Sequence, residues 1–230
     1  MRFTPRHPGF FLTFEGGEGS GKSTQLLALA RFLQDEGYPL LVTREPGGTG
    51  IGDDLRRILL DRTNFGGIND RTELLLYQAS RAQLVHQIIR PALERGLIVL
   101  CDRFSDSTTA YQGYGRGIDL TLIRQLSGAA TGGLRPDCTI LLDIHPAIGL
   151  ARARIRKGQN LDRLERETLA FHERVRQGYL RIAQEEPDRF LTVPATGDPE
   201  SIQGAIQHLI CRRLQASGLN PEPLAPWRVQ

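Results

Sequence analysis

Short apolar runs alternate with longer amphipathic stretches along this chain of 230 residues. Runs without polar interruption are typical of strands that are buried on both faces of a parallel sheet. The stretches between them repeat apolar residues at helical spacing, as Leu26, Leu29 and Leu33 do in the stretch 22–36, which Gly37 ends. The pattern predicts strands at 10–15, 39–43, 97–101, 138–143 and 190–193.

Helices are expected between these strands and after the last one. Asp70 is expected to cap the long helix 71–89, with Glu73 at the capping-box position, and a glycine-rich link at 113–117 is expected to separate two helices. Helices are predicted at 22–36, 51–60, 71–89, 91–96, 104–112, 119–131, from 146 onward, 166–185 and 199–214. This alternation indicates an α/β fold, with a five-stranded parallel sheet that has helices on both faces.

The two ends of the chain differ from its middle. Residues 1–8 precede the first apolar run and are expected to form a flexible arm. Residues 217–230 are rich in proline and are expected to form a surface tail. The remaining residues, 9–216, contain no internal repeat or linker and are predicted to form one domain.

The first apolar run leads into a glycine-rich turn that opens a helix. This turn, Gly16-x-x-x-x-Gly21-Lys22-Ser23, fits the pattern of the phosphate-binding loop (P-loop) at every fixed position. Lys22 is expected to reach the β- and γ-phosphates of a nucleotide, and the Ser23 hydroxyl to bind Mg²⁺. The alternative is a turn that binds nothing. Composition disfavours it, because of the 29 lysines and arginines only Lys22 and Lys157 are lysines.

Charge, cysteine content and hydropathy limit the possible partners. The formal net charge is +3, which by itself does not indicate nucleic-acid binding. The three cysteines are scattered and none is in a CxxC pair, so we expect neither a zinc site nor disulfides and favour a reducing compartment. No apolar run reaches the roughly 18 residues that span a bilayer. We therefore expect a cytoplasmic protein without a nucleic-acid or membrane partner.

Charged residues follow two of the predicted strands, where ligands of open parallel sheets bind. Asp102 has the position of a Walker B carboxylate that would hold Mg²⁺, although it could instead cap the helix from Phe104. Arg103 follows it, and Arg44 follows the strand 39–43. Guanidinium groups at strand ends suit an acceptor that is itself a phosphate, because such an acceptor needs charge neutralisation more than a general base. The alternative for each arginine is a solvated surface position.

Arginines are also dense in the segment 151–163. We predict a lid over about 150–163 that closes on the donor nucleotide, excludes water and brings cations to the transferring phosphate. The alternative is a basic, solvated helix face.

Six motifs, in order along most of the chain, are more specific than the P-loop alone. They are FEGGEGSGKST at 14–24, TREPGGT at 43–49, LLYQASRAQ at 75–83, DRFSDSTTAYQG at 102–113, RPD at 135–137 and LDRLE at 161–165. Together they resemble the thymidylate kinases of the bacterial type. The resemblance implies the P-loop nucleoside monophosphate kinase fold and transfer of the ATP γ-phosphoryl group to dTMP, giving dTDP and ADP in dTTP biosynthesis. It also implies Mg²⁺ as cofactor and a homodimer formed through the helix 71–89.

The resemblance further implies roles for individual residues. Those implied to be catalytic are Lys22, Arg103, Arg154, Arg44 and Glu18. ATP would be bound by Gly16, Gly17, Glu18, Gly19, Ser20, Gly21, Lys22, Ser23, Thr24, Arg152, Arg154 and Arg156. The acceptor dTMP would be bound by Glu18, Arg44, Tyr77, Arg81, Arg103, Ser107, Thr108, Tyr111 and Gln112. The metal would be held by Ser23 and Asp102.

Within the family, the catalytic arginine resides in either the P-loop or the lid. This P-loop has no arginine and the lid has three, so the chain is similar to the lid-arginine type. It departs from the family in having Tyr77 where a phenylalanine usually stacks on thymine, and in a slightly longer lid, which leaves open which lid arginine meets the γ-phosphate.

Three other activities are considered. One is another nucleoside monophosphate kinase, or a deoxynucleoside kinase, of the same fold. A regulatory GTPase would need an Asn-Lys-x-Asp signature, which neither lysine matches. Leu126-Ser127-Gly128 matches the start of a signature of transporter-type ATPases, but Ala129 does not fit the rest of that signature.

Overall fold

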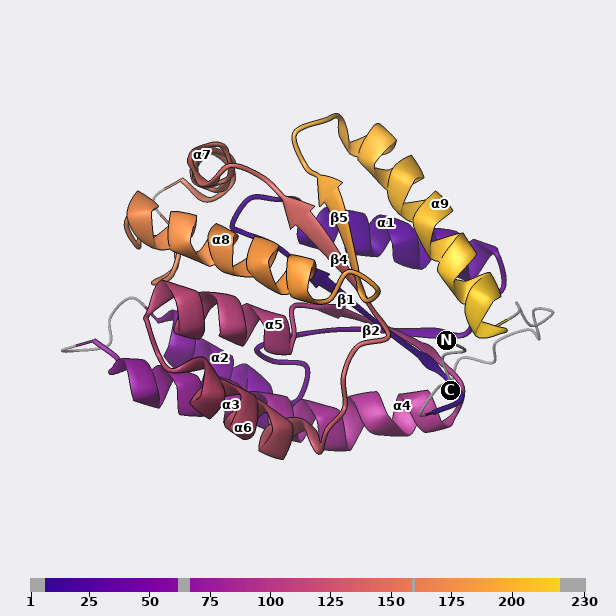
Figure 1. The fold of residues 1–230 in the computed structure, drawn as a ribbon, viewed down its shortest axis with the longest axis horizontal. Helices are drawn as coiled ribbons and strands as arrows, with labels where there is room; N and C mark the ends of the chain where they lie inside the picture. The colour runs from indigo at the N-terminus through magenta and orange to yellow at the C-terminus, as the bar shows by residue number, and fades with distance from the viewer. Residues whose placement is uncertain (1–6, 62–66, 159, 220–230) are drawn as a thin grey trace.

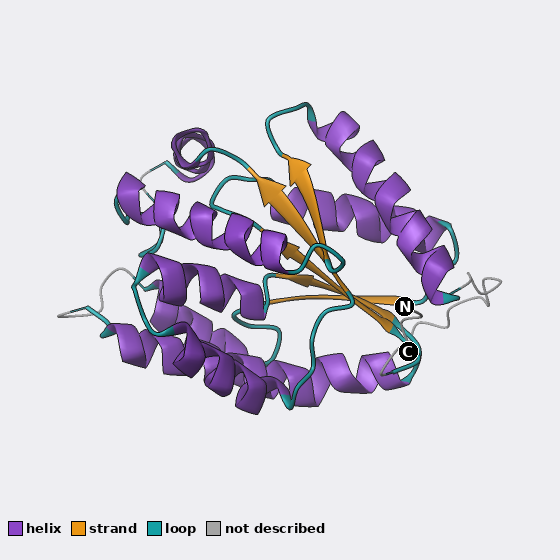
Figure 2. Ribbon diagram, in the orientation of Figure 1, coloured by secondary structure: helices purple, strands orange, loops and turns teal. Residues whose placement is uncertain are grey.

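A computed structural model describes residues 7–61, 67–158 and 160–219. In this part of the chain five parallel strands form one sheet: β1 (Phe10–Glu15), β2 (Leu40–Arg44), β3 (Ile98–Asp102), β4 (Cys138–Asp143) and β5 (Phe190–Pro194). The strand order is β2-β3-β1-β4-β5, with β1 in the centre (Figure 2). Every strand lies within one residue of its predicted bounds, and the predicted α/β fold is confirmed. The predicted arm and tail lie almost entirely outside the described residues.

Helices cover both faces of this sheet (Figure 1). On one face α1 (Lys22–Asp35) and α9 (Pro199–Ser217) lie side by side. The other helices are α2 (Gly50–Leu60), α3 (Asp70–Leu84), α4 (Arg90–Glu94), α5 (Ser105–Thr108), α6 (Leu120–Thr131), α7 (Pro146–Lys157) and α8 (Leu169–Glu185), with π-helical segments η1 (Val85–Ile89) and η2 (Thr109–Gly115). No helix among the described residues is long and apolar enough to cross a membrane.

The core has two sides because successive side chains of a strand point to opposite faces of the sheet. In β1, Leu12 and Phe14 pack in the cluster that contains the apolar residues of α1 and α9. Phe11, the residue before Leu12, points to the other face and packs in the cluster that contains Leu84, Ile89 and the apolar residues of α4. Both clusters bury side chains of β3 as well, so β1 and β3 are fixed at the centre and their carboxyl ends lie together.

The start of α3 corrects the predicted capping box. Asn69, and not Asp70, is the N-cap, and its side-chain oxygen accepts a hydrogen bond from the Arg71 backbone N–H at 3.0 Å. The Glu73 side chain is fully buried and accepts a hydrogen bond from Gln112 Nε2 at 2.7 Å. The prediction is wrong because contacts with distant segments hold the Glu73 carboxylate in the interior.

The predicted glycine-rich link at 113–117 is also partly wrong, because the helical path of η2 continues to Gly115. The glycines permit close packing there. A Cβ at Gly115 would lie 2.8 Å from Phe171 Cε2, and one at Gly178 would lie 2.7 Å from the Tyr114 ring. Because these two glycines have no side chain, η2 can pack directly on α8. This packing fixes the position of η2, which forms one wall of the candidate site.

Candidate active site

The P-loop joins β1 to α1 and packs against the start of α7. Gly16, Gly19 and Gly21 have φ values of 139°, 64° and 88°, which residues with a Cβ rarely adopt. A Cβ at Gly19 would also lie 2.0 Å from the Gly149 carbonyl oxygen, so backbone lies on backbone at this point. The sequence therefore folds locally into a tight turn ahead of a helix N-terminus, which is the geometry that binds phosphate.

Lys22, the first residue of α1, folds back over this turn. Its Nζ donates hydrogen bonds to the carbonyl oxygens of Gly16 (3.1 Å) and Gly17 (2.8 Å) and to Ser20 Oγ (3.3 Å). Burial, together with the charge of Arg103, lowers the pKa of Lys22 to about 8. A compact cation is thus held at the phosphate-binding end of the helix.

Ser23 and Asp102 meet where α1 begins and β3 ends. The Ser23 hydroxyl donates to Asp102 Oδ2 at 2.5 Å. Asp102 does not cap the next helix, because α5 has no side-chain cap and the Phe104 N–H donates instead to Glu15 Oε1 at 2.8 Å. Hydroxyl and carboxylate oxygens are ligands that suit Mg²⁺. The described residues contain no group of three or more His, Cys, Asp or Glu side chains that could hold a metal, so such an ion would complete its shell with water and phosphate oxygens.

Arg103 follows β3 with a φ of 71°, a left-handed conformation that costs about 1–2 kcal/mol for a residue with a Cβ. Its guanidinium donates to the Gly16 carbonyl (3.0 Å), to Glu18 Oε1 (2.8 Å) and to the Tyr111 hydroxyl (3.1 Å). Burial opposes ionisation of Glu18, but Arg103 and Lys22 outweigh it and lower the pKa of Glu18 to about 2. Arg103 therefore joins the P-loop to η2.

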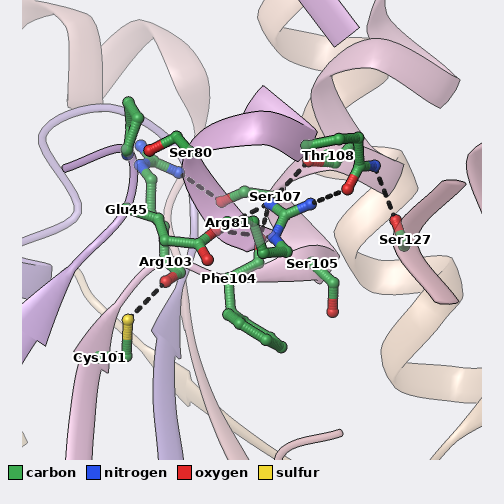
Figure 3. A network of polar contacts seen from close by, with 12 residues as sticks. Glu45, Ser80, Arg81, Cys101, Arg103, Phe104, Ser105, Ser107, Thr108 and Ser127 are labelled. Atoms are coloured by element: carbon green, nitrogen blue, oxygen red, sulfur yellow. Dashed lines mark hydrogen bonds and ion pairs between the residues drawn. The ribbon is translucent and has the colours of Figure 1, made fainter. Parts of the chain in front are cut away.

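Arg81 of α3 is almost fully buried at a second part of the site (Figure 3). Its Nε donates to Glu45 Oε2 at 2.8 Å and its NH1 to Gln78 Oε1 at 3.0 Å. Its NH2 donates to Thr108 Oγ1 at 2.9 Å and to the Phe104 carbonyl at 3.2 Å. These contacts fix the plane of the guanidinium, so Arg81 is preorganised for a ligand that lies against it.

Two more arginines lie near the end of β2. Arg44 pairs in register with Asp102, and its side chain is half exposed and contacts Asp53 at 3.1 Å. Arg56 of α2 donates from NH1 to the Pro46 carbonyl at 2.9 Å. Burial, followed by the charge of Arg44, lowers the pKa of Arg56. The two like charges thus lie close enough to favour an anion between them.

Glu15, the last residue of β1, is a fully buried carboxyl group close to Arg103. It accepts hydrogen bonds from the Phe104 N–H (2.8 Å), the Ser107 hydroxyl (2.6 Å) and the Tyr179 hydroxyl (2.8 Å). Burial, followed by the charge of Asp106, raises the pKa of Glu15 to about 7.

Glu15 is expected to make protein stability depend on pH. Between its ordinary pKa of 4.5 and about 7, the folded carboxyl keeps a proton that the unfolded chain has lost, so the free energy of unfolding falls as the pH rises. This decrease is at most about 3.5 kcal/mol, since one pKa unit corresponds to about 1.4 kcal/mol. Urea unfolding at both ends of this window measures it. Glu15→Gln, which cannot titrate, should remove this part of the pH dependence, and an unchanged dependence would contradict the assignment.

One cavity of about 230 Å³ is lined by Lys22, Arg44, Arg56, Arg81 and Arg103, but not by Glu15. Asp102 lies in its wall, as do most residues that are predicted to bind ATP or dTMP. They are Glu18, Gly19, Gly21, Lys22, Ser23, Thr24, Arg44, Tyr77, Arg81, Arg103, Ser107, Thr108, Tyr111, Gln112 and Arg156. Gly16, Gly17 and Ser20 instead contact the Lys22 amine behind the wall.

The wall also contains residues that the sequence did not single out: Glu45, Pro46, Arg56, Leu60, Phe104, Asp162, Leu164 and Glu165. Most of these were within reach of prediction, because Glu45 and Pro46 belong to the TREPGGT motif, Phe104 to DRFSDSTTAYQG, and the last three to LDRLE. Arg56 gives no signal in the sequence, since an arginine on an amphipathic helix reads as a solvated residue.

The three predicted lid arginines lie on α7 and point in different directions. Arg152 NH1 donates to the Ala195 carbonyl at 2.8 Å, beyond the end of β5. Arg156 lines the cavity, with its NH2 3.8 Å from Glu165 Oε1. Arg154 is exposed and does not line the cavity, because residues two apart on a helix lie on nearly opposite sides.

Comparison with known proteins gives one consistent result. The thymidylate kinase family model matches residues 14–206. A thymidylate kinase of Synechococcus sp. is 49% identical over 213 residues, covering 93% of this chain and 100% of that protein. One of Deinococcus radiodurans is 51% identical over 205 residues, covering 89% and 98%. The crystal structure of the thymidylate kinase from Ehrlichia chaffeensis matches with a TM-score of 0.69 and 33% identity, over 88% of this chain and 98% of that chain. The resemblance seen in the motifs is confirmed, and the chain belongs to the thymidylate kinase family.

Proposed function

We propose that this protein transfers the γ-phosphoryl group of ATP to dTMP, giving dTDP and ADP. The observation that carries the proposal is that Lys22 of the P-loop, Arg44, Arg103 and Arg81 line one cavity. A cavity with cations at these positions suits two substrates whose phosphates lie next to each other. The base of the acceptor would then lie against Arg81. Membership of the thymidylate kinase family supports the same reaction.

On the donor side, the P-loop and Lys22 would hold the β- and γ-phosphates of ATP. Ser23 and Asp102 would hold Mg²⁺, directly or through water. When bound, Mg²⁺ neutralises charge on the phosphate oxygens. Lys22 adds its own charge. Burial lowers the pKa of Lys22, and the negative charge of the bound phosphates would raise it again. These residues bind and orient the donor.

On the acceptor side, Arg44 and Arg103 would clamp the phosphate of dTMP. This phosphate is mostly dianionic at neutral pH and attacks without losing a proton, so the site needs no general base. Glu18 holds Arg103 in place at 2.8 Å and lies beside the Tyr111 hydroxyl at 2.6 Å. Glu18 and Tyr111 would therefore contact the sugar, where Tyr111 disfavours a ribose 2′-hydroxyl.

The base would be selected at Arg81. A guanidinium only donates hydrogen bonds, so it suits the O4 acceptor of thymine and opposes the amino group of cytosine. Thr108 Oγ1 already accepts from Arg81 NH2, and its own hydroxyl hydrogen remains to be donated to the base. Tyr77 would stack on the ring, with Ser107 and Gln112 near the same pocket.

A panel of acceptors tests the proposal. Initial rates of ADP formation with dTMP, dUMP, UMP, dCMP, GMP and thymidine should show dTMP preferred, with dCMP rejected because it places a donor against Arg81. Equal rates with another nucleotide would instead support a different kinase of the same fold. ATP hydrolysis that needs no acceptor would contradict the kinase assignment.

We infer that Arg156 is the lid arginine that reaches the γ-phosphate, in place of Arg154. Arg156→Ala should lower kcat by at least about 10²-fold, because an arginine that neutralises the transferring group contributes 10³-fold or more. Arg154→Ala is the matched control on the same helix and should retain kcat within about 3-fold, an effect below about 1 kcal/mol. Steady-state kinetics at saturating ATP and dTMP measure both. The reverse ranking would return the role to Arg154.

We also propose a cytoplasmic homodimer. Ile51 and Ile58 of α2 and Leu75 of α3 are large apolar side chains with 59%, 47% and 54% of their surface exposed. They lie on two helices that pack together, so α2 and α3 offer an apolar face to a second copy. Sedimentation velocity measures the assembly state.

A further inference from the structure

Glu73 is a fully buried carboxylate that the proposed chemistry does not use. It lies in the first turn of α3, with no exposed surface. Its carboxylate accepts a hydrogen bond from Gln112 Nε2 at 2.7 Å, and Oε2 accepts another from Arg116 NH2 at 3.3 Å. Oε2 also forms an ion pair with Arg163 NH2. One carboxylate therefore holds three side chains from two other segments.

These partners come from functionally different parts of the protein. Gln112 belongs to η2 and lines the cavity on its acceptor side. Arg163 is the last residue of the predicted lid, and it also donates from Nε to the Leu59 carbonyl at the end of α2, at 3.0 Å. Glu73 is thus a direct link between the lid segment and the acceptor pocket.

The burial of the Glu73 charge makes the loss of any of these contacts costly in free energy. Removing one cation from a buried carboxylate is destabilising, because less of its charge is then compensated. If the lid segment moves and withdraws Arg163, the Glu73 carboxylate must be satisfied by Arg116 and by Gln112 alone. The position of the lid and the position of the Gln112 amide are therefore not independent.

We propose that Glu73 is a positioning residue that couples closure of the lid on ATP to binding of dTMP. The inference rests on the proposed function, which places ATP under the lid and dTMP beside Gln112. A ligand that fixes Gln112 would favour the arrangement in which Glu73 holds Arg163, and that arrangement would be the one of the closed lid. By linkage, each substrate then tightens the binding of the other by the same factor.

Isothermal titration calorimetry of the full chain with a non-hydrolysable ATP analogue and Mg²⁺, with and without saturating dTMP, measures that factor. In the wild type dTMP should tighten analogue binding by about 10-fold, within the usual range for coupled sites. In Glu73→Gln, which keeps the shape but loses the charge, the factor should fall to about 2 or less. A general structural defect would weaken binding in both titrations and leave their ratio unchanged.

Arg163→Gln is a second variant that tests the inference even if Glu73→Gln does not fold. It removes the contact with the lid segment but leaves Glu73 with Arg116 and Gln112. In Arg163→Gln the coupling factor should fall as far as it does in Glu73→Gln. In the variant that carries both substitutions it should fall no further. Arg181→Gln, which removes an exposed ion pair with Glu185, should keep the wild-type factor. A wild-type factor near 1, or an unchanged factor in Arg163→Gln, would overturn the inference. Neither result affects the proposed function, which fails only if the wild type does not phosphorylate dTMP.

Discussion

Arg103→Ala is expected to lower kcat/KM for dTMP by about 10⁴-fold, within the range for an arginine that stabilises phosphoryl transfer. The expected loss is large because this guanidinium would clamp the acceptor phosphate and also contacts Gly16 and Glu18 of the P-loop. Without it, the partly buried Glu18 carboxylate would lose the cation that pairs with it at 2.8 Å. Arg103→Lys should recover only part of the rate, because an ammonium cannot reproduce a planar fork of donors.

The backbone at this position separates the effect on activity from the effect on stability. At a φ of 71°, glycine is not strained as alanine is, so Arg103→Gly should be more stable than Arg103→Ala by about 1 kcal/mol. Both variants should be equally inactive. Urea unfolding and steady-state kinetics on the same preparations measure the two quantities. If Arg103→Gly recovered activity along with stability, the arginine would be a structural residue and not a clamp.

Lys22→Ala is expected to lower kcat by about 10³-fold, as removal of a group that stabilises transition-state charge does. The Nζ lies within 3.3 Å of three oxygens of the P-loop, so its position is set by the loop and not by the ligand. Affinity for ATP should fall, whereas affinity for dTMP should stay within about 2-fold, a change of less than about 0.5 kcal/mol.

Lys22→Arg provides a charge-preserving control. The side chain is buried against the loop, so the larger guanidinium has no room to adopt the position of the ammonium. We expect this variant to remain at least about 10-fold below the wild type in kcat, a change of about 1.4 kcal/mol. Stopped-flow single-turnover measurements separate this loss from an effect on product release. A variant with wild-type turnover would show that any cation suffices at this position.

Elements that depend on neighbours in the sequence were predictable. The P-loop is a local structure, because its glycines, Lys22 and the following helix lie within a few residues of one another. The strands were equally clear, since β1, β3 and β4 are buried on both faces and carry few polar residues. Most of the candidate site followed from these elements, because carboxyl ends of parallel strands meet at one edge of a sheet.

Long-range contacts account for what the sequence did not reveal. Arg81 is held by Glu45, 36 residues earlier in the chain, and nothing in either motif indicates that the two side chains meet. Glu73 fits a capping box by its spacing, yet its partners lie 39, 43 and 90 residues away. A local rule fails there because a buried carboxylate gains more from a cation than from the end of its own helix.

The sequence by itself determined the order of strands and helices, the P-loop and the family, because these depend on local periodicity and on motifs of contiguous residues. Only the tertiary structure decided which charged groups share one cavity and which arginine of α7 lines it. Nothing in the sequence of this arginine-rich segment distinguishes Arg154 from Arg156. The packing of α7 on α8 sets the rotation of α7, so that Arg156 lines the cavity and Arg154 does not.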